Sequence, residues 1–380
     1  MEIVQSQPFD EIMFDEINST IAMNSPMEKR SRLISIPYDE ERAVPATISP
    51  CCSQDSAALF PTVTSKFCDI ESHYLIDPTV LGVGHHGSVR RCIHRTTGKQ
   101  FAVKSICKAD PSVKLQGIAR EISLLQEMKH KSMIQLVDVY EDSDFVHLVT
   151  ELCQGGELFD RIVQRSNAGK GCFSEQEAAR ILYQILNAVL YMQQHNVVHR
   201  DIKPENILFE TTEEDSCIKI IDFGLARKHY GDRGEPPMNT VVGTPYYIAP
   251  DVLQKSYDKS CDMWSIGVIA YILFAGYPPF NGTSNKEVYN AVRNGIYYFP
   301  SEDWKHISIG ARNFVMGLLQ RDPMRRMTVE QALRHPWLER QLNSMNMDES
   351  RDSVEVVYDR SSKKESILFR GLFRPRVKII

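Results

Sequence analysis

Three glycines at positions 82, 84 and 87 have the spacing G-x-G-x-x-G, within LGVGHHGSVRR at 81–91. This spacing occurs in loops that bind dinucleotides and in loops that cover the phosphates of a nucleoside triphosphate. A dinucleotide site requires a helix directly after the glycines, because the pyrophosphate lies on its N-terminus. Here a strand pattern, a turn and another strand pattern follow instead. Gly82, Gly84 and Gly87 are therefore predicted to form a flap over phosphates, with an ordinary glycine-rich hairpin as the alternative.

A lysine that could contact such a phosphate follows in the segment FAVKSI at 101–106. Strand alternation places Ala102 and Lys104 on one face, so that a small residue suited to an adenine ring lies beside a cation suited to a phosphate. Glu121, in the predicted helix that follows, could pair with Lys104 and position its ammonium group. A lone lysine in a strand is usually a solvated edge residue, so this assignment depends on the motifs further along the chain.

Further along, VVHRDIKPENILF at 197–209 has an order of residue types that is hard to obtain by chance. It contains the pattern H-R-D-x-K-x-x-N, which begins at His199. The segments KIIDFGLA, GTPYYIAPD and CDMWSIGVIAY follow in that order. Together with the glycine loop and the lysine strand, this ordered set resembles the eukaryotic protein kinases over residues 74–338, about 70% of the chain.

The resemblance implies a site for ATP and Mg²⁺ in which each matching residue has a role. Asp201 would accept or orient the proton of the substrate hydroxyl, and Lys203 would neutralise the transferring phosphoryl group. Asn206 and Asp222 would hold two Mg²⁺ ions that bridge the phosphate oxygens. Loop capping or turn formation, the usual role of Asp, is the alternative for Asp201 and Asp222.

The resemblance also outlines a pocket for ATP. Lys104 would bind the α- and β-phosphates, and Glu121 would lock it in place. In FVHLVTELCQGGE, Thr150 would occupy the gatekeeper position, and Glu151 and Cys153 would offer backbone groups to adenine. The predicted ATP-binding set comprises Leu81, Gly82, Gly84, Gly87, Val89, Ala102, Lys104, Thr150, Glu151, Cys153 and Glu157.

The substrate class follows from the same resemblance. Lys203, two residues after Asp201, is typical of Ser/Thr kinases, and Thr244 agrees, because its hydroxyl would bond to both residues. Glu157 resembles an acidic residue that contacts ribose and a substrate arginine, and Glu205 resembles a second acidic contact. Two carboxylates near the peptide groove would favour basic substrates such as R-x-x-S/T. For Glu157 the alternative is a place in the first turn of a helix, where negative charge is favourable.

Two departures from the family pattern carry expectations of their own. His85 and His86 lie at the tip of the glycine loop, where a solvent-exposed tip is favoured over a pH-dependent contact with ATP. Asp251 replaces the glutamate of the family's A-P-E segment, and it is one methylene shorter. It is therefore expected to need a local shift to reach its partner Arg326, without loss of activity.

A third departure lies in the segment RKHYGDRGEPPMNTVVGT, which is predicted to carry a regulatory site. Arg200, beside Asp201, would repel Lys and Arg neighbours unless an anion lay nearby. Thr240, three residues before Gly243, matches the phosphorylation site of the family. Phosphorylation of Thr240 is therefore predicted to raise activity.

The elements that must position these residues divide the chain into three regions. Residues 1–66 are polar, lack periodicity and are predicted to be flexible or disordered. Residues 74–338 are predicted to form an α+β catalytic domain with the bilobal kinase fold. Its small β-rich N-lobe covers about 74–151 and its larger α-helical C-lobe about 155–338. Residues 343–380 form a tail that starts acidic and ends basic and apolar.

The segments ELCQGGELFDRI, GTPYYIAPDVL and CDMWSIGVIAYILFAGYPPF most resemble the calcium/calmodulin-dependent group, including the calcium-dependent protein kinases. The chain has no EF-hand loop, so direct calcium control by this chain is not expected. The stretch 363–380 mixes six basic residues with apolar ones. It would suit calmodulin binding or intramolecular inhibition, with a disordered tail as the default.

Composition narrows the classes of partner and cellular location that the chain could have. The net charge of −5 gives no global attraction to nucleic acid, and the apolar stretch at 266–277 is too short for a bilayer and predicts a core helix. Nine cysteines without metal spacing indicate free thiols in a reducing compartment. The predicted partners are protein substrates, without nucleic acid or a membrane span, and the predicted location is the cytoplasm, with the nucleus left open. A pseudokinase scaffold and a small-molecule kinase remain as alternative functions.

Overall fold

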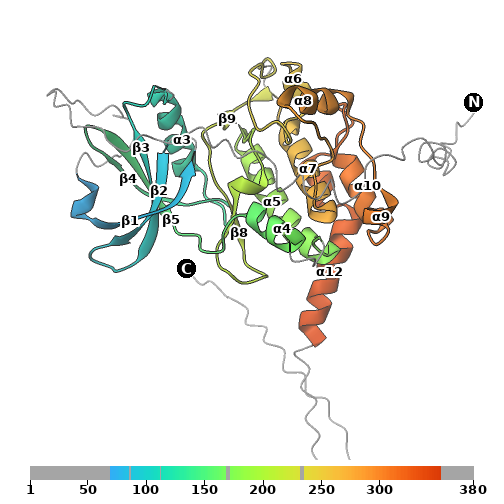
Figure 1. Ribbon diagram of the computed structural model, residues 1–380, viewed down its shortest axis with the longest axis horizontal. Helices are drawn as coiled ribbons and strands as arrows, with labels where there is room; N and C mark the ends of the chain where they lie inside the picture. The colour runs from blue at the N-terminus through green and yellow to red at the C-terminus, as the bar shows by residue number, and fades with distance from the viewer. Residues whose placement is uncertain (1–68, 85–86, 112, 168–171, 232–234, 352–380) are drawn as a thin grey trace, which may run out of the picture.

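The computed structural model describes residues 69–84, 87–111, 113–167, 172–231 and 235–351. These residues form a β-rich N-lobe and a helical C-lobe, which lie side by side (Figure 1). The predicted α+β, bilobal architecture is confirmed. The expectations for residues 1–66, for His85 and His86, and for the stretch 363–380 lie outside the described residues.

The N-lobe is built on one antiparallel sheet whose strand order is β1-β2-β3-β5-β4. A short 3-10 helix, η1 (Ile70–Ser72), precedes it. The strands are β1 (Tyr74–Gly84), β2 (Gly87–His94), β3 (Gln100–Cys107), β4 (Leu136–Glu141) and β5 (Phe145–Glu151). The order brings the glycine loop, which joins β1 to β2, next to β3, the strand that carries Lys104.

Helix α3 (Leu115–Glu127) connects β3 to β4. Its residues Ile118 and Ile122 are buried and form one apolar cluster with Ile106 of β3 and Leu148 of β5. Burial of this helical stripe against the sheet fixes α3 in place, since apolar area removed from water is the main stabilising contribution. The same packing sets the position of Glu121 relative to β3.

The C-lobe consists mostly of helices packed around one long buried helix. Its helices are α4 (Leu158–Asn167), α5 (Glu175–Gln194), α6 (Pro250–Leu253), α7 (Ser260–Ala275), α8 (Asn285–Asn294), α9 (Ser301–Trp304), α10 (Ile309–Leu318), α11 (Val329–Leu333) and α12 (Pro336–Arg351). Every residue of α7 from Cys261 to Ala275 is buried, which confirms the predicted core helix. Across the described ranges, no helix combines the length and apolar character that a bilayer crossing needs.

Two short strand pairs on the side of the C-lobe that faces the sheet hold the segments that contain the predicted catalytic residues. β6 (Val197–Val198) pairs with β9 (Arg227–Lys228), and β7 (Ile207–Phe209) pairs with β8 (Ile218–Ile220). All are antiparallel. Residues 199–206 therefore leave β6 and return through β7, while residues 221–226 lie between β8 and β9.

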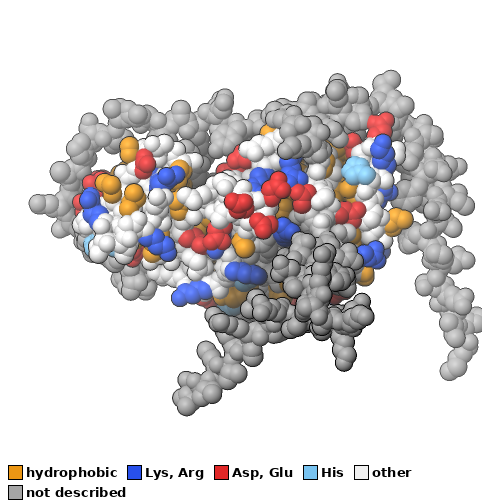
Figure 2. Space-filling model, turned by 90° about the horizontal axis from the view of Figure 1, so that it is seen from below, with side chains coloured by type: hydrophobic (Ala, Val, Ile, Leu, Met, Phe, Trp, Pro, Cys, Tyr) orange, Lys and Arg blue, Asp and Glu red, His pale blue; other side chains and the backbone are white. Residues whose placement is uncertain are grey.

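The surface of the described part carries both signs of charge. On the face seen from below, Asp and Glu side chains gather near the middle, and Lys and Arg side chains lie around and below them (Figure 2). This distribution agrees with the modest negative net charge of the chain. Among the described residues visible on this face, Lys and Arg side chains form no large continuous field (Figure 2).

Asp251 on α6 reaches its expected partner Arg326, and the local shift expected for the shorter side chain stays a prediction. Arg326 Nη2 lies 2.6 Å from Asp251 Oδ1, and both side chains are almost fully buried. Arg326 Nη1 also donates to the carbonyl oxygen of Ser260 at 3.0 Å. The shorter carboxylate engages the arginine through one oxygen, because Asp251 Oδ2 is buried without a hydrogen-bond partner. The pair joins α6 to the loop before α11.

Arg326→Met is expected to lower the free energy of unfolding by about 3–5 kcal/mol, because it leaves the Asp251 carboxylate buried without its counter-charge. Urea unfolding of the purified protein measures this. The matched control is Arg325→Met, at an exposed neighbouring position, which is expected to change stability by no more than about 0.5 kcal/mol. Equal effects of the two substitutions would show that the ion pair is not what matters at this position.

Candidate active site

Three polar side chains converge around Asp201, which is 5% exposed. Lys203 Nζ lies 3.0 Å from Asp201 Oδ2 and donates to Thr244 Oγ1 at 2.9 Å. Thr244 donates to Asp201 Oδ1 through its hydroxyl at 2.8 Å and through its backbone N–H at 3.1 Å. Asn206 Nδ2 donates to the carbonyl oxygen of Asp201 at 2.9 Å. The segments that contain Asp201 and Thr244, far apart in sequence, are thus joined at one carboxylate.

The backbone before Asp201 is held by Asp262, a buried acid on α7. Its carboxylate accepts the backbone N–H groups of His199 at 2.9 Å and Arg200 at 2.8 Å. Arg200 has a positive φ of 69°, which a non-glycine residue adopts only under constraint. Sequence reasoning assigned no role to Asp262. The available signal was an acidic residue at the start of an otherwise apolar helix, CDMWSIGVIAY, where burial requires a partner.

Asp222 lies next to this loop. The backbone N–H of Ile221 donates to the carbonyl oxygen of Asn206 at 2.9 Å. The segments that contain Asn206 and Asp222, the two predicted metal-binding residues, therefore lie side by side. Asp222 has a positive φ of 61°, and its Oδ1 accepts the backbone N–H of Gly224 at 3.1 Å. A carboxylate beside an amide oxygen is a donor set of the kind that Mg²⁺ prefers, with phosphate oxygens completing the coordination.

Lys104 and Glu121 form a contact that joins the sheet to α3. Lys104 Nζ lies 3.0 Å from Glu121 Oε1, and the side chains are 16% and 3% exposed. A Cβ atom built on Gly224 would lie 3.0 Å from Asp222 Oδ1 and 3.6 Å from Glu121 Oε2. The carboxylates of Glu121 and Asp222 therefore lie near one another, beside the ammonium group of Lys104.

These carboxylates keep Lys104 charged. Burial by itself would lower the pKa of Lys104, because it disfavours the charged form. The negative charges of Glu121 and Asp222 outweigh this effect and raise the pKa above its ordinary value. The side chain is therefore a fixed positive charge in the cleft at physiological pH.

The sheet brings the predicted pocket residues to one face. Val89 pairs with Lys104 in the β2–β3 ladder, and Ala102 pairs with Thr150 in the β3–β5 ladder. Directly opposed residues point to the same side of a sheet, and so do residues two apart. Val89, Ala102, Lys104 and Thr150 therefore share a face, as the alternation predicted for Ala102 and Lys104.

The glycine loop includes one position where only glycine fits. A Cβ atom on Gly87 would lie 2.0 Å from the carbonyl oxygen of Ser105, so any side chain would separate β2 from β3. Gly82 has no atom within 4 Å of the equivalent position, and Leu81 is 48% exposed. Gly84 ends β1, where it pairs with Gly87. No neighbouring atom of the described residues therefore requires a glycine at position 82, and the space beside it is open to a molecule that lies below the loop.

The segment after β5 retains part of its backbone hydrogen-bonding capacity for a ligand. The Glu151 N–H donates to the carbonyl oxygen of Gln135 at 3.1 Å, so the predicted contact of Glu151 with adenine falls to its carbonyl, beside the predicted contact of Cys153. The Thr150 hydroxyl donates to that carbonyl at 3.2 Å. Burial raises the pKa of the Cys153 thiol to about 12, so the thiol is neutral and unreactive here.

Two acidic side chains, Glu157 and Glu205, lie near the segment 199–206, to which Glu205 itself belongs. Burial raises the pKa of Glu157 to about 7, with further contributions from the carboxylates of Asp160 and Glu205 and an opposing one from Lys203. Burial also raises the pKa of Glu205, whose Oε2 is buried without a hydrogen-bond partner. Glu157 precedes α4 and forms a bridge with Leu208 of β7. A cation would satisfy both carboxylates.

Thr240 lies beside Arg200. Arg200 Nη1 donates to Thr240 Oγ1 at 3.1 Å and to the Tyr257 hydroxyl at 3.2 Å, and Arg200 Nε donates to the carbonyl oxygen of Leu225 at 2.7 Å. Thr240 is exposed. Sequence reasoning identified Thr240 and Arg200 but missed Tyr257, whose hydroxyl also donates to the Thr240 carbonyl oxygen at 2.8 Å.

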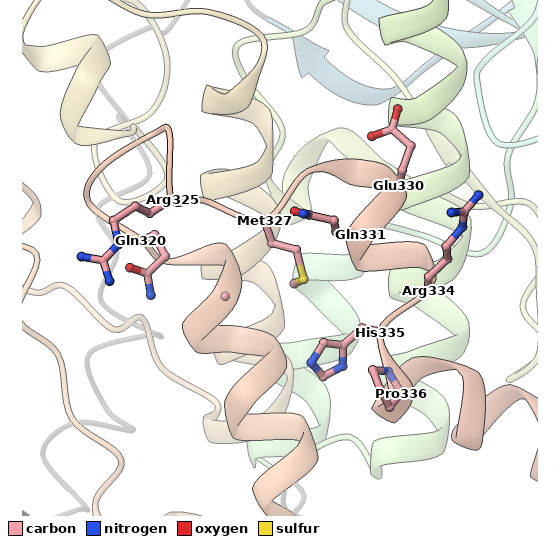
Figure 3. A pocket seen from close by; sticks show the side chains of 9 residues that line it. Gln320, Arg325, Met327, Glu330, Gln331, Arg334, His335 and Pro336 are labelled. Atoms are coloured by element: carbon pink, nitrogen blue, oxygen red, sulfur yellow. The ribbon is translucent and has the colours of Figure 1, made fainter. Parts of the chain in front are cut away.

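A surface hollow of about 600 Å³ lies elsewhere, between α10 and α11 (Figure 3). Its lining includes Arg325, Met327, Gln331, Arg334 and His335. It contains none of the predicted site residues, and its mixed polar lining converges on no single point. Within the ranges the structure describes, no three His, Cys, Asp or Glu residues group as a metal site. The candidate site is therefore the cleft between β1–β3 and the segments around Asp201 and Asp222.

Comparison with known proteins agrees with this location. The family model "Protein kinase domain" matches residues 76–338. "Calcium-dependent protein kinase 5" of Plasmodium falciparum is 43% identical over 272 residues, which cover 72% of this chain and 46% of that protein. "Calcium-dependent protein kinase 3" of Plasmodium yoelii yoelii is 39% identical over 287 residues, 75% of this chain and 51% of that protein.

A probable myosin light chain kinase of Dictyostelium discoideum is 42% identical over 276 residues, which cover 72% of this chain and 68% of that protein. The chain thus spans about half the length of the calcium-dependent relatives that it matches. The matched region includes every residue of the cleft described above.

Proposed function

The chain belongs to the protein kinase family, and on that basis we propose that it is a protein serine/threonine kinase that transfers the γ-phosphoryl group of ATP to Ser and Thr hydroxyls. One observation carries the proposal. Asp201, Lys203 and Thr244 contact one another at 2.8–3.0 Å, and the Lys104–Glu121 pair faces Asp222 across the same cleft. This arrangement provides the charges that phosphoryl transfer requires.

In this mechanism Asp201 receives or orients the proton of the substrate hydroxyl. Its Oδ1 is held by Thr244 through two hydrogen bonds, so the carboxylate is fixed before substrate arrives. Lys203 lies against Oδ2 and places a positive charge where the transferring phosphoryl group would pass. A preorganised charge of this kind stabilises the transition state more than the ground state, which is what lowers the barrier.

The nucleotide end of the cleft supplies binding and orientation. Lys104, held by Glu121, would bind the α- and β-phosphates as a fixed positive charge. Asp222 and the amide oxygen of Asn206 would hold Mg²⁺, which when bound neutralises phosphate charge and aligns the γ-phosphoryl group. The side-chain amide nitrogen of Asn206 already donates to Asp201, which leaves the amide oxygen for the metal. Adenine would lie on Ala102 beside the Glu151 carbonyl.

These contacts favour a catalytic kinase over a pseudokinase scaffold. A scaffold needs the fold but not an intact set of ionic contacts, and loss of Lys104, Asp201 or Asp222 would have indicated one. All three residues are present, and the partners that position Lys104 and Asp201 are also present. The geometry therefore supports turnover.

The direct test is to incubate the purified full chain with radiolabelled ATP and Mg²⁺ on a degenerate peptide array. Label is expected on Ser and Thr peptides and not on Tyr peptides. The paired control is Lys104→Met, which removes the phosphate-binding charge and is expected to reduce labelling to background. Labelling that persists in Lys104→Met, or no labelling by the parent protein, would reject the proposed activity.

We also propose that the preferred substrates carry an arginine three residues before the phosphoacceptor, in the pattern R-x-x-S/T. Glu157 and Glu205 support this, because both are carboxylates in a partly buried position near or within the segment 199–206, and the carboxylate of Glu205 has an oxygen without a partner. A guanidinium group would bond to them with two or more donors and remove the cost of their burial.

This preference is expected to depend on pH. The pKa of Glu157 is about 7, so lowering the pH from 8 to 6 protonates the carboxylate and removes its attraction for arginine. The KM for an R-x-x-S peptide should therefore rise by about tenfold between pH 8 and pH 6, in proportion to the lost ionised fraction. A peptide with alanine in place of arginine is the control and should show a flat profile. Glu157→Gln should flatten the profile of the arginine peptide, and an unchanged slope would contradict the assignment.

Phosphorylation of Thr240 is expected to raise kcat by about tenfold, because a phosphate would add charge-assisted hydrogen bonds to Arg200, whose Nη1 already lies 3.1 Å from the Thr240 hydroxyl. Activity is measured after separation of phosphorylated and phosphatase-treated protein, with intact mass as the check. Thr240→Ala should match the phosphatase-treated protein, and Asn239→Ala, at the exposed neighbouring position, should match the parent. An equally active Thr240→Ala protein would refute the prediction.

A further inference from the structure

Lys219 is a buried lysine that the proposed chemistry does not use. It lies in the middle of β8 and is 7% exposed. Its Nζ lies 3.0 Å from Glu151 Oε2, at the end of β5. A lysine is rarely buried without a partner, because the charge loses its hydration. The pair therefore forms an ionic contact between a strand of the C-lobe and the last residue of the N-lobe sheet.

Glu151 is held on its other sides as well. Its Oε1 accepts the backbone N–H of Gln135 at 2.9 Å, and its own backbone N–H donates to the Gln135 carbonyl oxygen at 3.1 Å. Both carboxylate oxygens and the N–H are thus engaged within the protein. The Glu151 carbonyl is the backbone group that the proposed function assigns to adenine. Its position is determined by the contacts that hold this residue.

Lys219, the other residue of the ion pair, lies on the strand that precedes the predicted metal-binding residue Asp222. On β8, the backbone N–H of Ile220 donates to the Ser132 carbonyl oxygen at 2.9 Å, and the Ile134 N–H donates to the Ile220 carbonyl oxygen at 3.0 Å. Asp222 follows Lys219 by three residues, about 10 Å along extended backbone. Lys219 therefore joins the residue assigned to adenine to β8, the strand that precedes Asp222.

We propose that Lys219 is a positioning residue for the nucleotide, which through its ion pair with Glu151 fixes the adenine-binding segment relative to β8 and Asp222. The proposal rests on the proposed function, since it concerns the same nucleotide site. Without the ammonium group, the Glu151 carboxylate would keep only its bond to the Gln135 N–H. The end of β5 would then be tied to β8 only indirectly, through Gln135 and the Ile134–Ile220 hydrogen bond, and could shift. Adenine recognition would weaken, because its hydrogen-bonding groups would no longer be held in place.

The proposal predicts that Lys219 contributes to the binding of the adenine part of the nucleotide and not to that of its phosphates. Adenosine and ADP should therefore lose the same amount of affinity when Lys219 is replaced. The affinities of the full chain for adenosine and for ADP with Mg²⁺ are measured by calorimetry and by displacement. Lys219→Met is expected to weaken both by the same factor, about fivefold to tenfold. Lys104→Met should weaken the binding of ADP and leave that of adenosine unchanged, because Lys104 is assigned to the phosphates, which adenosine lacks. The KM for ATP should rise with the same factor in Lys219→Met, with little change in kcat.

The chain offers a control matched in burial and chemistry. Lys108 Nζ lies 2.8 Å from Glu141 Oε1 in the N-lobe, with side chains 13% and 1% exposed, away from the cleft. Lys108→Met should lower the melting temperature as Lys219→Met does, but leave nucleotide affinity unchanged. If both substitutions weaken adenosine equally, general destabilisation explains the result and the proposal is overturned.

A double-substitution cycle tests whether the two residues act as a pair. Glu151→Gln should reproduce the loss seen in Lys219→Met, and the double variant should lose no more than either single one. Lys219→Arg keeps the charge and should retain most of the affinity, which guards against a failure of Lys219→Met to fold. Additive losses, or a loss confined to ADP, would overturn the proposal.

The two hypotheses fail in different ways. If the parent protein phosphorylates peptides and binds adenosine, but Lys219→Met binds adenosine equally well, only the role of Lys219 is rejected. If the parent protein binds neither adenosine nor ADP with Mg²⁺, the proposed function is rejected and the role of Lys219 with it.

Discussion

Asp222→Asn is expected to lower the rate of phosphoryl transfer by about a thousandfold, because loss of the charge that holds the metal removes several kcal/mol of transition-state stabilisation. The substitution keeps the size of the side chain but replaces its charge. Gly224 N–H can still donate to the remaining oxygen, as it does to Asp222 Oδ1 at 3.1 Å. The fold should therefore persist while Mg²⁺ binding weakens.

The measurement is single-turnover transfer to a Ser peptide over a range of Mg²⁺ concentrations. The half-saturating Mg²⁺ concentration should rise, so that high Mg²⁺ recovers part of the rate. Asp215→Asn is the control, since Asp215 is an exposed acid in the loop between β7 and β8, and its substitution should have no effect. Turnover in Asp222→Asn equal to that of the parent would reject the metal-binding role.

Asp201→Asn is expected to reduce transfer by about a factor of 10² to 10⁴, the usual contribution of a positioned acid–base group. The parent carboxylate accepts hydrogen bonds from Thr244 and contacts Lys203 at 3.0 Å. An amide presents a donor in place of one acceptor and cannot take the substrate proton. The loss should appear in the chemical step and not in nucleotide binding, because Asp201 contacts none of the residues assigned to adenine or to the α- and β-phosphates, and its partner Lys203 is assigned to the transferring group.

Single-turnover kinetics isolate this step, since kcat can be limited by product release. The affinity for ADP with Mg²⁺ and the melting temperature serve as controls for an intact site, and both should stay close to those of the parent. A parallel loss of ADP affinity would indicate that Asp201 supports the nucleotide site structurally. An unchanged transfer rate would remove Asp201 from the chemistry altogether.

The candidate site residues could be named from the sequence because each lies in a short motif with its own local geometry. Strand alternation is enough to place Ala102 and Lys104 on one face, and the β2–β3 and β3–β5 ladders agree with it. The ordered motifs likewise pointed to Asp201 and Asp222. The roles assigned to these residues stay predictions until the substitutions are measured.

Other residues could not be identified because their roles come from contacts between distant segments. Asp262 acts on residue 199 from a helix more than sixty positions away, and Lys219 meets Glu151 only when the two lobes are packed together. The Asp251–Arg326 contact also joins distant segments, so side-chain length alone could not decide whether a local shift is needed. Regulation through 363–380 and the cytoplasmic location also stay predictions.

The left-handed backbone at Arg200 and Asp222, with φ of 69° and 61°, implies that thermal stability and catalytic rate oppose each other in this protein. Such a conformation costs a non-glycine residue about 1–3 kcal/mol, which the rest of the C-lobe must offset. Selection for heat resistance alone would therefore favour variants that relax these two positions. Those variants would outlast the parent on heating and turn over more slowly.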